Sequence, residues 1–169
     1  VLRHNQARQH DRVRIFELGR RYRATADGVA EDDVCGGLAW GPVWPEQWAA
    51  PATDVAGFFD IKSDVEAVLA GVDGIRFTAA AHPALHPGQS ARVWRGDTPV
   101  GWVGVLHPAL VRDLGLGPAP ALFELDTAPA LAAGVVRYAE ISRFPAVRRD
   151  LAVLVPAAVT AAELVAAVQ

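Results

Sequence analysis

The sequence lacks methionine, holds one cysteine, Cys35, and has no apolar run as long as a membrane-spanning helix. With a single cysteine, no disulfide can form within the chain, and a reducing compartment is expected. A membrane helix needs roughly 20 apolar residues, and neither such a run nor a secretion signal is present. We therefore expect a cytoplasmic protein that does not contact a membrane.

Nucleotide-binding fingerprints are also missing, since G-x-x-x-x-G-K-[ST] does not occur. What is present is an ordinary globular composition, with 51% hydrophobic and 21% charged residues in a chain of 169. This composition can form one domain, or one domain and part of another. The chain opens on Val1 and closes on a helical pattern without a stop signal, so we expect a piece of a longer protein.

Charge is unevenly distributed along the chain. Residues 1–23 hold seven arginines and two carboxylates, whereas residues 24–136 hold five basic and fourteen acidic side chains. Residues 137–169 hold four arginines and three acids. Basic clusters can contact nucleic acid, but they are more often solvated faces.

Periodicity predicts an α+β fold in which mostly antiparallel strands carry helices on one side. The expected strands cover residues 11–22, 34–40, 75–81, 90–96, 99–106 and 121–127, and the expected helices cover 1–9, 58–72 and 107–116. Residues 24–33 are predicted to form an acidic loop, 41–51 a proline-rich loop and 81–88 another loop. In the helix of residues 58–72, Asp60 is expected to cap the start, and Ser63 with Glu66 offers an alternative start.

A second unit is predicted to begin near residue 139. Residues 148–155 are expected to form a strand, and a helix should follow, with Thr160 and Glu163 forming a capping box. A single strand and a single helix cannot build a core of their own. The expected domains are therefore residues 1–138 and a truncated unit, 139–169.

Few residues suggest catalysis or metal binding. His82 and His86 have the i, i+4 spacing of helical zinc ligands, but a proline follows each, so a rigid turn with polar caps is favoured. His107 also precedes a proline. Asp60 and Asp64 are better explained as acids near a helix start than as metal ligands. We expect no metal site.

The aromatic residues and the cysteine allow two interpretations each. Trp40, Trp44 and Trp48 could stack on nucleic-acid bases, but the prolines between them favour packing within or beside the core. Cys35 lies on an apolar strand without a nearby base, which favours a buried thiol over a nucleophile.

Several motifs resemble one family along essentially the whole chain. ISRFPAVRRDLAVLV at 141–155 is similar to a junction in the phenylalanyl-tRNA synthetase β subunit, bacterial type. RIFELGRRY, FFDIKSDVEAVL, HPALHPGQSARVW, VGWVGVLHPAL and ALFELD resemble further family motifs in the same order. Ser63 departs from the usual glycine, which is harmless within a helix.

The resemblance implies a class II synthetase-like module over residues 1–138, followed by the start of a ferredoxin-fold anticodon-binding domain. It implies a partner α subunit, phenylalanine tRNA and an (αβ)₂ tetramer that joins phenylalanine to this tRNA with ATP and Mg²⁺. No catalytic residue and no cofactor are expected in this chain, because residues 122–131 lack the glycine pattern and arginine of an active site. Arg20 and Arg21 follow the early strand without the usual R-x-E.

Three arginines remain as expected tRNA contacts. The resemblance places Arg143, Arg148 and Arg149 at the domain junction, where they would either pair with acids or contact tRNA phosphate. An alternative for the whole chain is a stand-alone nucleic-acid-binding or scaffold protein with a degenerate synthetase fold. Binding to an α-like partner would separate the two.

Overall fold

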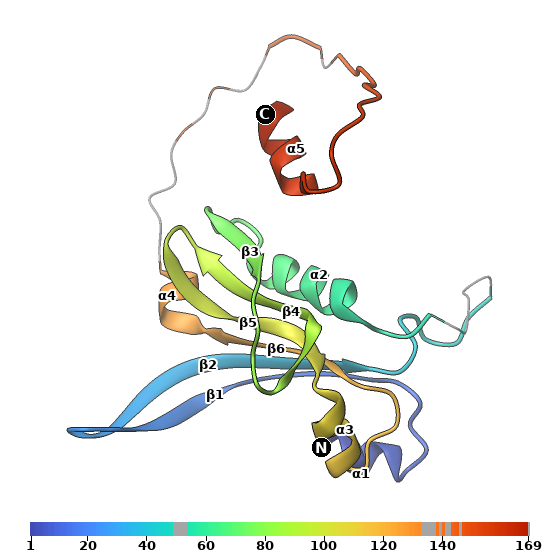
Figure 1. Ribbon diagram of the computed structural model, residues 1–169, viewed down its shortest axis with the longest axis vertical. Helices are drawn as coiled ribbons and strands as arrows, with labels where there is room; N and C mark the ends of the chain where they lie inside the picture. Colours follow the sequence, from blue (N-terminus) through green and yellow to red (C-terminus); the bar gives the residue numbers. More distant parts are fainter. Residues whose placement is uncertain (49–53, 133–137, 139, 141–142, 146, 169) are drawn as a thin grey trace. The chain divides into compact units, whose positions relative to one another are not determined.

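The computed structural model describes residues 1–48, 54–132, 138, 140, 143–145 and 147–168. The chain divides into two compact units, Val1–Val135 and Val136–Gln169. The first holds a β-sheet with helices packed on it (Figure 1), and the described part of the second holds one helix. The predicted α+β fold is confirmed.

The sheet of the first unit contains six strands, every neighbouring pair antiparallel, in the order β1-β2-β6-β5-β4-β3. The strands are β1 (Val13–Thr25), β2 (Gly28–Trp40), β3 (Ile75–Ala79), β4 (Leu85–Arg95), β5 (Thr98–Leu106) and β6 (Ala121–Asp126). Every predicted strand of residues 1–138 is present. Strands β1 and β2 form a long hairpin that projects from the sheet (Figure 1).

Cross-strand register assigns each side chain to one of two faces, because paired residues share a face and neighbouring rows alternate. The row Phe16, Gly37, Phe123, Val103 and Ala91 lies on what we call the core face. The next row, Glu17, Gly36, Glu124, Trp102 and Arg92, lies on the opposite, open face.

Helix α2 (Phe58–Val68) supplies the main cover of the core face. Its side chains Ile61 and Val65 are buried with Phe123 and Val103 in the hydrophobic core. Apolar residues recur at helical spacing from Ile61 to Val72, which predicts one buried stripe; Ile61, Val65 and Leu69 are buried, but Val68 is 48% exposed. The helix begins before Asp60, whose carboxylate accepts a hydrogen bond from the Gly57 backbone N–H at 2.8 Å, so Asp60 stabilises the first turn without being its N-cap.

Three short helices complete the first unit. These are α1 (Leu2–Gln6), α3 (Pro108–Asp113) and α4 (Thr127–Leu131), of which α4 was not predicted. His107 caps α3 by accepting a hydrogen bond on Nδ1 from the Ala109 N–H at 3.1 Å. Ala130 of α4 is buried in the same core as α2, so both helices lie on the core face.

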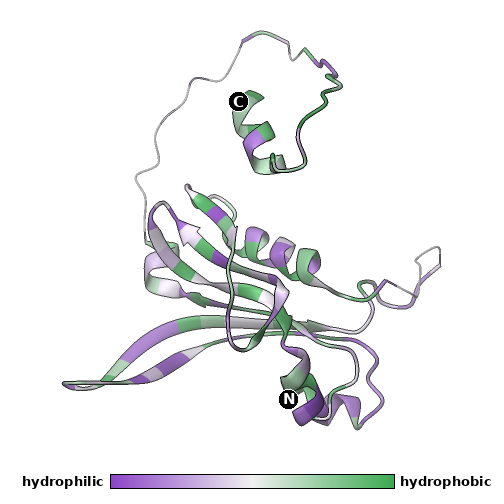
Figure 2. Cartoon of the chain, in the orientation of Figure 1, coloured by the Kyte–Doolittle hydropathy of each residue, from purple (hydrophilic) through white to green (hydrophobic). Residues whose placement is uncertain are grey.

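Two predicted loops differ from the structure. Residues 24–33 were expected to be an acidic loop, yet β1 runs to Thr25 and β2 starts at Gly28. The acids of this segment alternate along β2 and face arginines on β1, so they form cross-strand ion pairs. Figure 2 shows this hydrophilic character along the hairpin. Strand β4 likewise begins at Leu85, inside the predicted loop of residues 81–88. Residues 41–48 form no helix or strand, as predicted, and 49–51 lie outside the described residues.

The second unit contains α5 (Ala161–Val168). Its capping box is confirmed, since Glu163 accepts from the Thr160 N–H at 2.7 Å and the Thr160 hydroxyl accepts from the Glu163 N–H at 3.3 Å. The strand predicted at 148–155 is wrong, because the described residues 148–155 pair with no strand. An isolated strand has no ladder to join, and Leu151 and Leu154 are correspondingly exposed.

Candidate functional site

The core face of the β1–β2 hairpin carries exposed apolar side chains beyond the cover of α2. Phe16 is 77% exposed, Leu18 69% and Tyr22 63%, and we call these three residues the hairpin strip. Register places all three on the same face as the buried Phe123. Exposed apolar side chains on one face are a common feature of surfaces that contact another molecule.

A groove of about 300 Å³ lies between Phe16 of this strip and α2. Phe16 and Val68 line opposite walls of the groove, and Arg14 of β1 forms an ion pair with Asp64 of α2 beside it. Asp64 was expected to act as an acid near a helix start, whereas in the structure its ion pair links α2 to β1. The pair is partly exposed, so it contributes at most about 1 kcal/mol.

The open face of the same hairpin carries a cluster centred on Arg21. Its Nη1 donates to Glu124 Oε1 at 2.5 Å, and its Nη2 donates to Asp126 Oδ1 at 2.7 Å and to Asp32 Oδ2 at 3.1 Å. We call these three carboxylates the Arg21 cage. Arg23 Nε also donates to Asp32, at 2.8 Å. Arg21 Nε is buried and has no hydrogen-bond partner among the described residues.

The cage changes the ionisation of its members. Burial lowers the pKa of Arg21, but hydrogen bonds to Asp32 and Glu124 and the charge of Asp126 outweigh this, so the pKa is raised above its ordinary value. Hydrogen bonds from Arg23 and then Arg21 lower the pKa of Asp32. Both groups therefore stay charged at neutral pH, and Arg21 has two of its three nitrogens committed to carboxylates.

An arginine in this state is a poor ligand for a phosphate group. Phosphate binding by arginine depends on a free, often bidentate, pair of N–H donors. Here Glu124, Asp126 and Asp32 occupy those donors and add negative charge around them. Among the described residues, no three His, Cys, Asp or Glu side chains are arranged to hold a metal ion.

The cage could not be predicted from the sequence because its partners are distant in the chain. Arg21 and Glu124 are 103 residues apart, and Arg21 and Asp126 are 105 apart. The local signal was present in the alternating arginines of β1 and acids of β2. It was misread because residues 24–33 were expected to be a loop.

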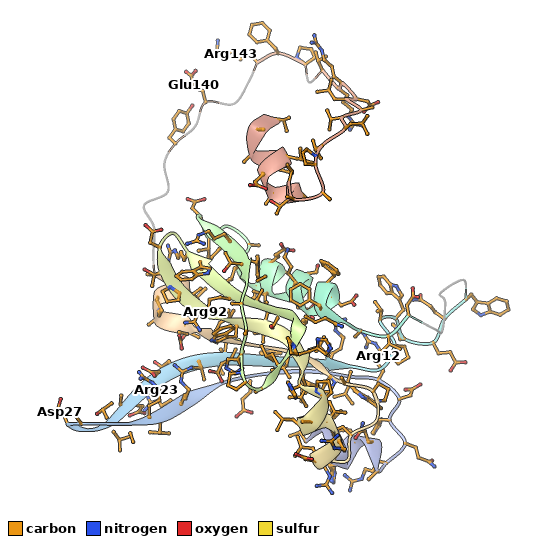
Figure 3. The ribbon with its side chains drawn as sticks, in the orientation of Figure 1. Arg12, Arg23, Asp27, Arg92, Glu140 and Arg143 are labelled. Carbon is orange, nitrogen blue, oxygen red and sulfur yellow. The ribbon has the colours of Figure 1, made fainter. Side chains whose placement is uncertain are left out.

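The arginines expected to contact tRNA lie in the second unit. Arg143 (Figure 3), Arg148 and Arg149 are all exposed, and none forms an ion pair with another described residue. Their proposed phosphate contact therefore stays a prediction. Figure 3 also labels Arg23 and Asp27 on the projecting hairpin of the first unit.

The histidines cap turns, as predicted. His82 Nδ1 accepts from the Ala84 N–H at 3.2 Å, and His86 Nδ1 accepts from the Gly88 N–H at 3.1 Å. Such local bonds hold the backbone next to each proline.

The tryptophans and Cys35 have mixed outcomes. Trp40 packs as expected and donates from Nε1 to the Pro118 carbonyl at 2.8 Å, but Trp48 is 99% exposed and Trp44 56%, so packing was wrong for these two. Cys35 is buried, and burial raises the pKa of its thiol, which disfavours a nucleophile.

None of the helices in the described part of the chain is long and apolar enough to cross a membrane.

The fold of this sheet and its helices resembles that of a solved aminoacyl-tRNA synthetase. It is similar to the solved structure of PylSc, a pyrrolysyl tRNA synthetase from Desulfitobacterium hafniense, with a TM-score of 0.56. The likeness covers 77% of this chain and 44% of that one at 17% sequence identity, so it concerns the fold alone.

The family follows from sequence. A model described as "Phenylalanyl tRNA synthetase beta chain CLM domain" matches residues 1–127, and the chain belongs to this family. The resemblance noted from the motifs is thereby confirmed.

Individual relatives agree with this assignment. A phenylalanine–tRNA ligase beta subunit from Thiobacillus denitrificans is 47% identical over the whole chain. Beta subunits from Burkholderia pseudomallei and Methylococcus capsulatus are 46% and 45% identical over 92% and 97% of it. The chain spans 21%, 20% and 21% of these relatives, about a fifth of their length.

Proposed function

We propose that this chain is a non-catalytic module of the β subunit of a phenylalanine–tRNA ligase. In the complete enzyme, an (αβ)₂ tetramer in the cytoplasm, the α subunit would attach phenylalanine to its tRNA with ATP and Mg²⁺. Residues 1–138 would form the class II synthetase-like part, and 139–169 the beginning of a ferredoxin-fold anticodon-binding domain. The module would support subunit assembly and tRNA positioning.

The Arg21 cage carries the non-catalytic assignment. An ATP site on the sheet needs an arginine that is free to bind phosphate. Arg21, the partly buried arginine of the hairpin's open face, is bonded to Asp32, Glu124 and Asp126 instead. Its surroundings carry three negative charges, which repel the phosphates of ATP.

The hairpin strip supports a role in assembly. Phe16 lines the groove along α2, and Leu18 and Tyr22 are exposed further along β1. About four-fifths of the length of the first relative lies outside the matched region. A further segment of the β subunit, or the α subunit, would bury this strip.

Arg143, Arg148 and Arg149 are the arginines of the second unit proposed to contact tRNA phosphate.

Pyrophosphate exchange tests the catalytic part of the proposal. The purified chain with phenylalanine, ATP and Mg²⁺ should give no exchange above a protein-free blank, whereas the assembled αβ enzyme should exchange in the same assay. Phenylalanine-dependent exchange by the chain without α would contradict the non-catalytic assignment.

Co-purification tests the assembly part. In full-length β subunit, the double substitution Phe16→Asp with Leu18→Asp should reduce the α subunit recovered with β at least severalfold, because charge is costly in an apolar contact. Leu114→Asp is the matched control, since Leu114 is 46% exposed and lies at the end of α3, away from the strip. Equal recovery with both variants would show that the strip is not needed for assembly.

A further inference from the structure

We propose that the open face of β3, β4 and β5 binds the phosphates of single-stranded RNA through two arginines, Arg76 and Arg92, each stacked on a tryptophan. Arg76 lies over the Trp94 ring at 4.7 Å from its centroid, and Arg92 over the Trp102 ring at 4.6 Å. These four residues form what we call the stacked-arginine surface. The choice of RNA rests on the proposed role in a tRNA ligase.

Register places the stacked-arginine surface on one side of the sheet. Arg76 pairs with Trp94 across β3 and β4, and Arg92 pairs with Trp102 across β4 and β5. Thr78, which pairs with Arg92, shares the face of Arg76 and accepts a hydrogen bond from Trp94 Nε1 at 2.7 Å. The helices α2 and α4 pack on the opposite, core face.

Both guanidinium groups are held in place but keep N–H donors available. Arg92 (labelled in Figure 3) forms no ion pair with a described carboxylate. Arg76 has one weak pair, at 3.9 Å, with the fully exposed Asp97, and its Nε donates to the Gly96 carbonyl at 3.2 Å. Stacking restrains each planar group without using its hydrogen-bonding edge.

Arg76 and Arg92 differ from Arg21 in the number of carboxylates around them. Glu124 and Asp126 also point to the open face, but both are bonded to Arg21. Asp32 and Glu17 lie on this face as well, so its hairpin end carries more carboxylates than arginines, whereas the positive charge lies over β3 and β4. A basic, aromatic face of this kind complements an anionic polymer with planar groups.

Spacing favours a continuous strand as the ligand. Because Arg92 is opposite Thr78, Arg76 is its diagonal neighbour, at a typical separation of about 7–8 Å between strands. Neighbouring phosphates of one extended strand can therefore meet both arginines. His82 lies beside the surface, with its ring 4.7 Å from that of Trp102, and adds a further planar group for base stacking.

Salt-dependent binding tests the proposal in the assembled enzyme of α and full-length β. The probes are a short fluorescent single-stranded RNA and phenylalanine tRNA. The double substitution Arg76→Gln with Arg92→Gln should weaken binding about tenfold. It should also reduce the magnitude of the slope of log K against log salt concentration by about 1.4, because two phosphate contacts are lost.

Arg112→Gln is the matched control. It removes one charge from α3, where the side chain is exposed and not stacked on an aromatic ring, and should leave the slope unchanged. An unchanged slope in the double variant overturns the proposal. Equally tight binding of a polyglutamate peptide overturns it too, since the surface would then recognise negative charge without regard to RNA.

Ultraviolet cross-linking covers the case in which the double variant fails to assemble. In the unmodified enzyme, the RNA should cross-link to peptides that carry Trp94 or Trp102, and cross-links confined to other peptides would overturn the proposal. If α and β associate normally but these results are negative, only the RNA surface is wrong. If the unmodified subunits do not associate, the proposed function fails instead.

Discussion

The two halves of the sheet's core face differ in how they are stabilised. Under α2, the side chains of Val93, Val103 and Phe123 are almost fully buried against Ile61 and Val65. On the hairpin, α4 covers the same face only in part in the described structure, and the hairpin strip remains exposed. Backbone pairing and cross-strand ion pairs hold the hairpin together instead.

Residues under α2 therefore determine the stability of the first unit, whereas the exposed residues of the hairpin are available for interaction. Burial of apolar area under α2 supplies the free energy that holds the first unit together. The hairpin has little buried apolar area of its own, so its exposed side chains can change with small cost to folding. Substitutions in the two halves should therefore have opposite consequences for stability and for assembly.

The largest expected effect on the free energy of unfolding comes from the part of the core face that lies under α2. Ile61→Ala should lower the free energy of unfolding by about 2–5 kcal/mol, because it leaves a cavity at a side chain that is 1% exposed. Phe16→Ala should change it by only about 0.5 kcal/mol or less, because that ring is already in solvent. Urea denaturation of the chain measures both, and similar losses would mean that the hairpin strip is buried in solution.

A smaller effect is expected where the two halves meet. A side-chain Cβ at Gly37 would overlap the Phe123 ring, so Gly37→Ala should cost about 1–3 kcal/mol by overpacking. Gly36→Ala, one residue earlier, has its nearest neighbour at 3.8 Å and should cost clearly less. Thermal unfolding compares them, and equal melting temperatures would show that the Phe123 ring moves aside freely.

The smallest effect should be a pH dependence confined to the hairpin. The pKa of Asp32 lies below its ordinary value of 3.8, so its contribution is present above that value and is lost as the pH falls through the folded-state pKa. Asp32→Asn should therefore reduce the loss of melting temperature between pH 6 and pH 3. Asp97→Asn, at a fully exposed turn residue, is the control, and an identical acid response in both variants would argue against the ion pairs.

Much of the fold followed from local patterns. The i, i+4 and i+7 spacing of apolar residues predicted α2, and alternation predicted β1. Thr160 and Glu163 predicted the cap of α5. Each of these signals depends on neighbours within a few residues, which is why sequence alone was sufficient.

The failures have a common cause in long-range pairing. The run 148–155 is apolar enough for a strand, but a strand forms only with a partner, and no described residue provides one. The segment 24–33 is too acidic to suggest a strand until the arginines of β1 are placed opposite it. The stacking of Arg76 and Arg92 likewise depends on the cross-strand register, which places a tryptophan beside each arginine.

The position of β1 at the sheet edge has a consequence for self-association. A long edge strand with exposed Phe16 and Leu18 is a template on which further strands can add and aggregate. Arg14, Arg20 and Arg23 extend from the same strand. Each of these arginines is already paired with a carboxylate of α2 or β2, so the edge carries a row of ion pairs. A second copy aligned edge to edge would have to disturb these charged groups, which disfavours fibre-like addition.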